Sequence, residues 1–191
     1  VVHGTVSHQH IYGLLHRVLW PLAAGRPIGR RLFFPEDLAR VLSQDDASWL
    51  VASPAHLKRL PESIDWQAVH GRVRRVFSSG GALPPGAGPT AARLLGTPPV
   101  EIYGSSETGG IAWRCWDTEQ PVWRALPGVA WRIDDGALVV QSPHLPPDGG
   151  EWRTQDRAEA DGDGGFRLLG RVDRIVKLEE RRISLDALER D

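Results

Sequence analysis

Methionine is missing from this sequence of 191 residues, and cysteine occurs once, at Cys115. A single cysteine cannot form an intrachain disulfide, so a reducing compartment, the cytoplasm, is expected. Because Cys115 stands beside tryptophans, we expect it to pack in a core rather than to act as a catalytic thiol. The lack of methionine and the start at Val1 predict a piece of a longer protein.

Long apolar runs and an excess of charge of one sign are missing as well. No apolar run approaches the roughly 20 residues that cross a bilayer, and no N-terminal stretch has the organisation of a secretory signal. The net charge of -1 argues against a general binder of nucleic acid or of membrane surfaces. We therefore expect neither a nucleic-acid partner nor a membrane span, and we expect basic clusters such as residues 72–75 to be solvated faces or anion contacts.

The first half of the sequence alternates between helical and extended patterns. Residues 10–23 carry apolar side chains at helical spacing, and we expect Pro21 and Gly25 to end this helix. Pro35 opens a second helix, and Ser53 is expected to cap a third. Strands are expected at residues 49–52, 73–78 and 100–103. This alternation predicts an α/β unit around a mainly parallel sheet.

The second half reads as antiparallel hairpins. Residues 129–133 alternate between apolar and polar side chains, and residues 134–136 then turn the chain into the apolar residues 138–140. Residues 161–165, rich in glycine and aspartate, predict the turn of a second hairpin. We therefore expect a small antiparallel β subdomain after the parallel sheet.

Two segments that follow predicted strands contain residues suited to binding a nucleotide. The glycine-rich turn at residues 78–84 would let the backbone approach a ligand at the carboxyl end of a strand, where open α/β sheets bind nucleotides. The segment 101–110 combines the ring of Tyr103, the hydroxyls of Ser105 and Ser106 and the carboxylate of Glu107, which suit a purine, a phosphate and Mg²⁺. Read singly, each segment is also compatible with an ordinary turn or a polar loop on which Tyr103 merely packs.

Two later charged segments complete the set. In residues 152–156, the carboxylate of Asp156 suits two ribose hydroxyls, and residues 170–177 contain the basic side chains of Arg171 and Lys177. Each of them alone reads as a charged surface stretch more readily than as a site. Taken together and in this order, the four segments are more specific.

Their order and spacing resemble the adenylate-forming superfamily of acyl-CoA synthetases, aryl-CoA ligases, luciferases and peptide-synthetase adenylation domains. The family's glycine turn matches residues 80–82, and its Tyr-Gly-x-Thr-Glu loop matches residues 103–107 with serine in place of threonine. Its Thr-Gly-Asp motif matches residues 154–156, where Gln155 replaces glycine, and its Gly-Arg-x-Asp motif matches residues 170–173. Residues 6–15 and 179–184 look similar to the synthetase-like ligases of aryl-polyene pigment pathways.

The resemblance implies roles for individual residues. Glu107 would bind Mg²⁺ and, with Ser106, form the catalytic pair, while His10, Gly81 and Gly109 would border the acid and Asp173 would be the interdomain hinge. The remaining implied contacts are to ATP or AMP, from Gly80, Gly81, Ala82, Glu101, Tyr103, Gly104, Ser105, Ser106, Asp156 and Arg171.

The implied activity is ATP-dependent conversion of a carboxylic acid, expected to be aromatic, into its acyl-AMP, followed by transfer to the thiol of coenzyme A or of the phosphopantetheine of an acyl carrier protein. Residues 1–172 would be the C-terminal portion of the large adenylate-binding domain, and residues 173–191 the hinge and the start of a C-terminal lid. The family's phosphate-grasping loop and lid lysine have no counterpart here, so we expect this chain alone to be inactive. Glu180, at a position that is usually glycine in the thiol tunnel, leaves the second half-reaction open. The alternative is a degenerate, non-catalytic fragment that binds a nucleotide or a partner.

Overall fold

The computed structural model describes residues 1–147, 149–172, 175–178 and 181–184, the last two ranges by their backbone only. The chain forms two compact units, residues 1–101 with 115–121, and residues 102–114 with 122–191. Within the described ranges, no helix has both the length and the apolar character needed to cross a bilayer. The predicted class, a mainly parallel sheet with helices plus a small antiparallel β part, is confirmed.

A parallel sheet with the order β2-β1-β3-β4-β5 organises the first unit. Its strands are β1 (Val2–Gly4), β2 (Ile28–Leu32), β3 (Ser48–Ala52), β4 (Val73–Ser78) and β5 (Pro99–Ser105), the last of which continues into the second unit. The strands predicted at residues 49–52, 73–78 and 100–103 are confirmed, whereas β1 and β2 were not predicted. Both are short, and β1 is paired on each side, so its formation depends on neighbouring strands rather than on local pattern.

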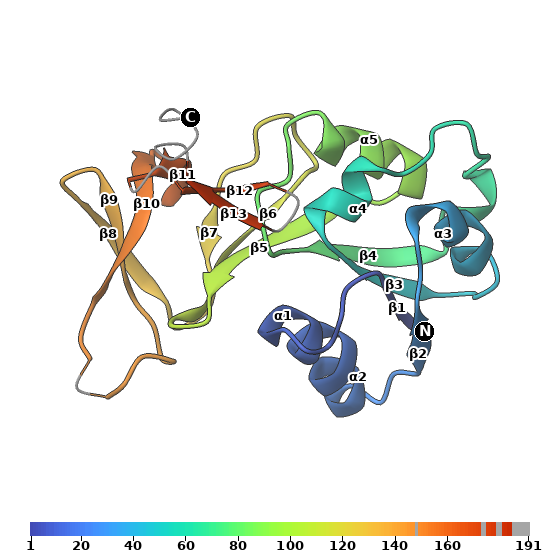
Figure 1. Ribbon diagram of the computed structural model, residues 1–191, viewed down its shortest axis with the longest axis horizontal. Helices are drawn as coiled ribbons and strands as arrows, with labels where there is room; N and C mark the ends of the chain where they lie inside the picture. Colours follow the sequence, from blue (N-terminus) through green and yellow to red (C-terminus); the bar gives the residue numbers. More distant parts are fainter. Residues whose placement is uncertain (148, 173–174, 179–180, 185–191) are drawn as a thin grey trace. The chain divides into compact units, whose positions relative to one another are not determined.

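Helices cover both faces of this sheet: α4 and α5 lie on one face and the α1–α2 segment on the other (Figure 1). The helical elements are α1 (Ile11–Leu14), the π-helix η1 (Leu15–Leu19), α2 (Trp20–Ala23), α3 (Pro35–Leu42), α4 (Pro54–Lys58), the 3₁₀-helix η2 (Gln67–Val69) and α5 (Ala87–Leu95). Ser53 caps α4 as predicted, because its side chain accepts a hydrogen bond from the backbone N–H of His56.

The helix predicted at residues 10–23 is confirmed as a continuous helical segment at residues 11–23, but Pro21 lies inside α2 and does not end it. The residues before α2 form the π-helix η1 (Leu15–Leu19), whose backbone hydrogen bonds join residues five positions apart instead of four. This wider turn accommodates Pro21, which has no backbone N–H to donate. Gly25 then reverses the chain with a φ of 60°, as the glycine there predicted.

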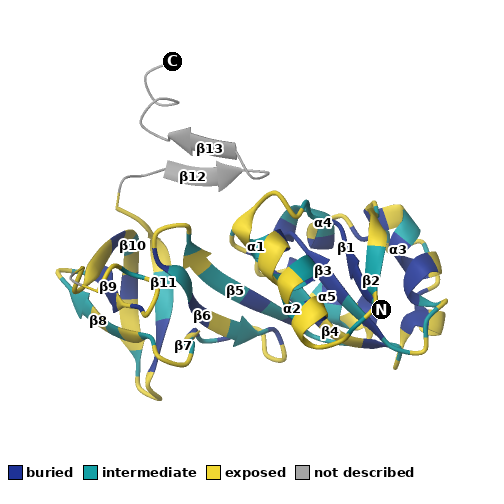
Figure 2. Cartoon of the chain, turned by 90° about the horizontal axis from the view of Figure 1, so that it is seen from below, coloured by how far each residue is buried: buried dark blue, intermediate teal, exposed yellow. Residues whose placement is uncertain are grey.

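The core of the first unit lies between the sheet and the helices α3, α4 and α5. Leu38 and Leu42 of α3, Leu50 of β3 and Leu95 of α5 are all completely buried. The opposite helical segment is different, since Figure 2 shows exposed residues along the outer side of α1–α2. The strongly apolar α1–α2 segment therefore presents part of its apolar surface to solvent.

The second unit contains the hairpins. A four-stranded antiparallel sheet has the order β11-β10-β9-β8, and Phe166, which is completely buried, lies in the apolar cluster of this unit. Both predicted hairpin turns are confirmed between β8 and β9 and between β10 and β11. The strands are β6 (Gly109–Cys115), which ends in the first unit, β7 (Arg124–Ala125), β8 (Ala130–Asp134), β9 (Ala137–Gln141), β10 (Trp152–Asp161), β11 (Gly165–Arg171), β12 (Ile175–Leu178) and β13 (Arg181–Ser184).

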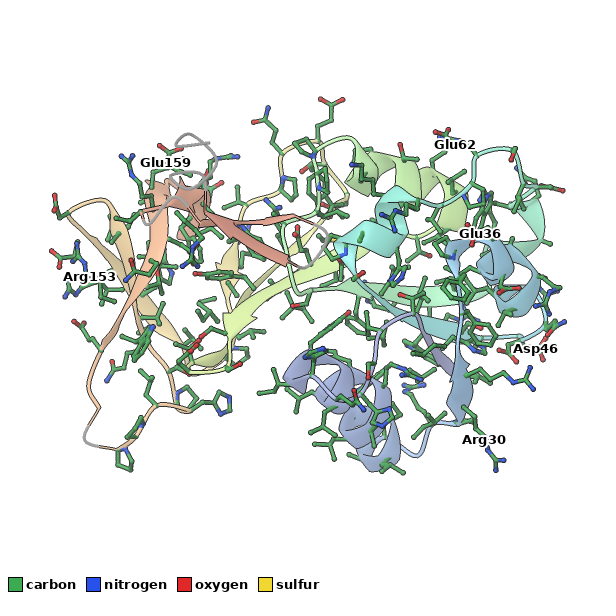
Figure 3. All side chains as sticks on the ribbon, in the orientation of Figure 1. Arg30, Glu36, Asp46, Glu62, Arg153 and Glu159 are labelled. Carbon is green, nitrogen blue, oxygen red and sulfur yellow. The ribbon has the colours of Figure 1, made fainter. Side chains whose placement is uncertain are left out.

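Arg30, Arg153 and Glu159 are exposed charged residues of the two units. Figure 3 shows Arg30, on the edge strand β2, pointing away from the ribbon, and Arg153 and Glu159 on β10. Arg153 pairs with Asp134 across the sheet at 2.5 Å, at an exposed position where such pairs contribute little stability. Arg30, and Arg74 and Arg75 of the basic cluster at residues 72–75, are exposed, which is compatible with the predicted solvated faces.

Candidate functional site

The glycine turn of the first unit leaves room beside its backbone. It follows β4, whose last residue, Ser78, is completely buried. Gly80 has a φ of 96°, which L side chains rarely adopt, but Gly81 has no such constraint, and no atom lies within 4 Å of a Cβ built on either residue. Packing within the described protein therefore does not require a glycine at position 81. The open backbone at this strand end is suited to close approach by a ligand.

Glu101 braces this turn from the neighbouring strand. Its carboxylate accepts hydrogen bonds from the backbone N–H of Leu83, at 2.6 Å, and from the indole Nε1 of Trp116, at 3.0 Å. The residue is only 1% exposed, so neither oxygen is presented to solvent. The geometry gives Glu101 a positioning role, and the direct nucleotide contact predicted for it stays a prediction. Trp116 was missed in the sequence because nothing local connects its ring to a carboxylate of another strand.

The histidine segment, residues 6–17, is fixed by close backbone packing. His10 stands immediately before α1 and is exposed. Gly13 is buried against the preceding loop, where an added Cβ would lie 2.0 Å from the carbonyl oxygen of Ser7. The buried guanidinium of Arg17 donates to the carbonyl oxygen of Val6 at 2.7 Å and so holds the same loop. Glycine at position 13 is therefore a packing requirement of this segment.

In the second unit, two residues that are 53 positions apart meet directly. The hydroxyl of Tyr103, on β5, donates to Oδ2 of Asp156, on β10, at 2.5 Å. Nη1 of Arg171, on β11, lies 3.9 Å from Oδ1 of the same carboxylate. The Thr154 side chain accepts a hydrogen bond from the backbone N–H of Asp156 at 3.1 Å. Three predicted nucleotide contacts, Tyr103, Asp156 and Arg171, therefore lie together.

Electrostatics keep the hydroxyl of Tyr103 protonated. Burial raises the pKa of Tyr103, and the charge and the hydrogen bond of Asp156 raise this pKa further. The ring packs against Trp123 and Phe166, with centroid distances of 5.6 and 6.5 Å. Tyr103 is thus a fixed hydrogen-bond donor, and Asp156, whose side chain is 21% exposed, keeps acceptor capacity for further donors.

The predicted polar loop at residues 101–110 is shorter than expected. β5 extends to Ser105 and β6 begins at Gly109, so only residues 106–108 form the turn. The Ser105 hydroxyl shares a 3.0 Å hydrogen bond with the hydroxyl of Thr108 and accepts from the backbone N–H of Thr108 at 3.2 Å. Ser106 and Glu107 are exposed at the tip of the turn. The Ser105 hydroxyl therefore shapes the turn, whereas the phosphate contact expected for it stays a prediction.

Further bonds and close contacts make this turn rigid. Thr108 is completely buried, and its carbonyl oxygen accepts a hydrogen bond from the Ser142 hydroxyl at 2.7 Å. A Cβ on Gly104 would lie 2.3 Å from the carbonyl oxygen of Gly109, and Gly109 itself has a φ of 67°. Thr108 and Ser142 were not singled out in the sequence, where nothing links a turn residue to a residue 34 positions later.

A metal would have few protein ligands here. Across the described part of the chain, no group of three or more His, Cys, Asp or Glu side chains lies within reach of one ion. Mg²⁺ is usually held by one or two carboxylates together with phosphate oxygens and water, so the site predicted at Glu107 stays a prediction. Glu107 is the exposed carboxylate at the tip of the turn. Asp173, the predicted hinge residue, lies outside the described residues, so its role and the predicted boundary at residues 172–173 stay predictions.

Comparisons with known proteins find a matching family and several similar ligases. The family model described as AMP-binding enzyme matches residues 1–151. The 4-coumarate–CoA ligase of Cereibacter sphaeroides is 35% identical over 85 residues, which cover 44% of this chain and 18% of that protein. A malonyl-CoA ligase in a ternary product complex with methylmalonyl-CoA and AMP is 28% identical, with a TM-score of 0.76, over 99% of this chain and 48% of that one.

Two further solved structures share the fold at lower identity. ATP-bound MatB from Rhodopseudomonas palustris is 22% identical with a TM-score of 0.76, over 99% of this chain and 44% of that chain. The amide bond synthetase McbA from Marinactinospora thermotolerans is 22% identical with a TM-score of 0.80, over the same shares, 99% and 44%. This chain therefore spans less than half the length of each of these relatives.

Proposed function

The chain belongs to the AMP-binding enzyme family, and on that premise we propose that it serves the ATP-dependent activation of a carboxylic acid. The carboxylate attacks the α-phosphorus of ATP and pyrophosphate leaves, which gives an acyl adenylate. A thiol, of coenzyme A or of the phosphopantetheine of an acyl carrier protein, then attacks the acyl carbonyl, and AMP leaves.

The meeting of Tyr103, Asp156 and Arg171 is the observation that carries this proposal. Asp156 accepts from Tyr103 and lies near the cation of Arg171, yet its carboxylate has more acceptor sites than these partners use. Two adjacent ribose hydroxyls are donors that fit such a carboxylate. We propose that Asp156 binds the ribose, that Arg171 assists it, and that Tyr103 holds the carboxylate and offers its ring to the adenine.

The glycine turn is proposed to serve the base of the same nucleotide. Gly80 and Gly81, which precede Ala82, have no atom within 4 Å of a Cβ built on them, and the carboxylate of Glu101 fixes the turn through Leu83. An open but braced backbone can accept a planar base without a reorganisation cost. Gly104 is proposed to contribute to the nucleotide site through its lack of a side chain, which lets the Gly109 carbonyl oxygen lie close to the Gly104 backbone.

Charge is the main barrier to the first step. The attacking carboxylate and the phosphates are all anions, and two unit charges 4 Å apart repel by roughly 4 kcal/mol at an effective dielectric constant near 20. Bound Mg²⁺ would neutralise phosphate charge, and the exposed carboxylate of Glu107 is proposed to hold it. The hydroxyl of Ser106, at the same tip, is proposed to donate to the α-phosphate, with the amides of the turn beside it.

The acid is proposed to be aromatic and to lie beside His10, Gly81 and Gly109. The likeness of residues 6–15 to aryl-polyene ligases supports this, as does the 4-coumarate–CoA ligase relative. Residues 1–172 are proposed to belong to the large adenylate-binding domain, residues 173–191 to the hinge and lid, and the site of action to be the cytoplasm.

The test is pyrophosphate release by the full-length gene product with ATP, Mg²⁺ and a panel of aryl and alkyl acids. Acid-dependent release, with aryl acids preferred, is expected. Release with alkyl acids only would remove the aromatic assignment, and no release with any acid would remove the activation reaction.

A non-catalytic nucleotide-binding role is the second candidate, because Gln155 replaces the family's glycine beside Asp156. AMP-dependent thermal stabilisation without pyrophosphate release would favour it.

A further inference from the structure

Trp116 connects β5 and α5 inside the first unit. Its backbone N–H donates to the carbonyl oxygen of Pro99, the first residue of β5, at 2.9 Å, and its indole Nε1 donates to Glu101 at 3.0 Å. Its ring lies against α5, because a Cβ built on Gly88 would lie 2.2 Å from the indole Cδ2. Trp116 is only 4% exposed, so this side chain acts within the unit and not at its surface.

The glycine turn lies in the connection between β4 and α5, and Trp116 restrains this connection at two places. Through its indole N–H it holds Glu101, whose carboxylate accepts the backbone N–H of Leu83 at 2.6 Å. Through its ring it packs on Gly88, the second residue of α5. The backbone of the turn is therefore held between a hydrogen bond at Leu83 and a packing contact at the start of the helix.

The buried carboxylate of Glu101 makes this arrangement sensitive to the loss of one donor. Glu101 is 1% exposed, and a buried anion is stable only where hydrogen bonds replace those of water. Its Oε1 accepts from the Leu83 N–H and its Oε2 from the Trp116 indole. Without the indole N–H, Oε2 would lose a buried donor, and the carboxylate would reorient toward other donors or water. The Leu83 N–H would then lose a fixed partner, and the turn would lose its brace.

We propose that Trp116 is a positioning residue for the nucleotide base: its indole N–H orients Glu101, which holds the backbone of the glycine turn where the base binds. This inference rests on the proposed function and adds to the site a buried residue that acts through another. A turn that is fixed before binding avoids the cost of being ordered on binding. The contribution of Trp116 therefore appears in the affinity for the nucleotide and not in the chemical step.

Trp116→Phe tests the proposal, because it keeps an aromatic ring against Gly88 and removes the indole N–H. In calorimetric titration of the full-length gene product, the AMP Kd should weaken on the order of 10-fold. In pyrophosphate release, the KM for ATP should rise by a similar factor, whereas kcat at saturating ATP should stay within about twofold. A role in stability alone would change neither the Kd nor the KM of the folded protein.

Trp66→Phe is a matched control in the same core cluster. Trp66 is also 4% exposed and its indole also donates at 3.0 Å, but to the carbonyl oxygen of Pro61, which is not part of the turn. Urea unfolding should show a similar loss of stability in both variants, while the AMP Kd of Trp66→Phe should stay within about twofold of the wild type. An equal loss of AMP affinity in both variants would show a general effect of core damage and overturn the proposal.

Glu101→Leu tests whether Trp116 acts through Glu101. Leucine has no acceptor, so this substitution removes the bonds to Leu83 and to Trp116 together. The AMP Kd of Glu101→Leu and that of the double variant with Trp116→Phe should then agree within about twofold, because no bond remains for the second substitution to remove. A further weakening on the order of 10-fold in the double variant would overturn the route through Glu101.

The results also separate this inference from the proposed function. A wild-type protein that does not bind AMP would remove the nucleotide site and this inference with it. AMP binding by the wild type, with an unchanged AMP Kd and an unchanged KM for ATP in Trp116→Phe, would overturn the role of Trp116 alone.

Discussion

The contact between Tyr103 and Asp156 predicts that substitutions at the two positions affect AMP binding differently. Asp156→Asn keeps the shape of the side chain but turns charge-assisted hydrogen bonds into neutral ones, each of which is weaker by about 1 to 1.5 kcal/mol. For two ribose hydroxyls the loss is about 2 to 3 kcal/mol, which corresponds to an AMP Kd that is roughly 30- to 150-fold weaker. Tyr103→Phe removes the donor at 2.5 Å and keeps the carboxylate for the ribose, so the AMP Kd should stay within about twofold.

Stability distinguishes the two variants further. Because the Tyr103 hydroxyl donates to a charged, half-buried partner, its removal should lower the free energy of unfolding by about 1.5 to 3 kcal/mol. The assays are calorimetric titration of AMP and urea unfolding of the full-length gene product, with Asp163→Asn, an exposed carboxylate of the same unit, as the control. An unchanged AMP Kd in Asp156→Asn, together with a loss of stability, would show that Asp156 only holds Tyr103 and does not bind the ribose.

The remaining predictions concern the metal ligand and the packing of the histidine segment. Glu107→Gln should lower pyrophosphate release by on the order of 10²- to 10³-fold and leave the Tm unchanged, since Glu107 is exposed; normal turnover at low Mg²⁺ would remove it as the ligand. Gly13→Ala should lower the free energy of unfolding by about 1 to 3 kcal/mol, because the new Cβ would lie 2.0 Å from the Ser7 carbonyl oxygen. Gly162→Ala, where no atom lies within 4 Å of the new Cβ, is its control in the same urea titration, and equal stability of the two variants would refute the packing argument.

Local features of this protein were predictable because they depend on neighbours in the sequence. The alternation at residues 129–133 gave β8, and the glycine-rich residues 161–165 formed the turn between β10 and β11. Ser53 before Pro54 gave the capped start of α4. Each of these signals lies within a few residues of the structure that it predicts.

The fold prediction failed where a local signal met tertiary packing. Pro21 reads as the end of a helix, but the π-helix before it accommodates the proline. The polar segment at residues 101–110 reads as a loop, but strand formation continues through Ser105, so that only residues 106–108 turn.

By itself, the sequence determined the α/β class, the hairpins and the set of residues that resemble a nucleotide site. The tertiary structure decided what those residues do to one another. Tyr103 and Asp156 are brought within 2.5 Å across 53 positions, and Glu101 is turned inward to Leu83 and Trp116. These contacts depend on strand register and on packing between distant segments, where a shift of one residue reverses the face that a side chain occupies, and no local pattern records that choice.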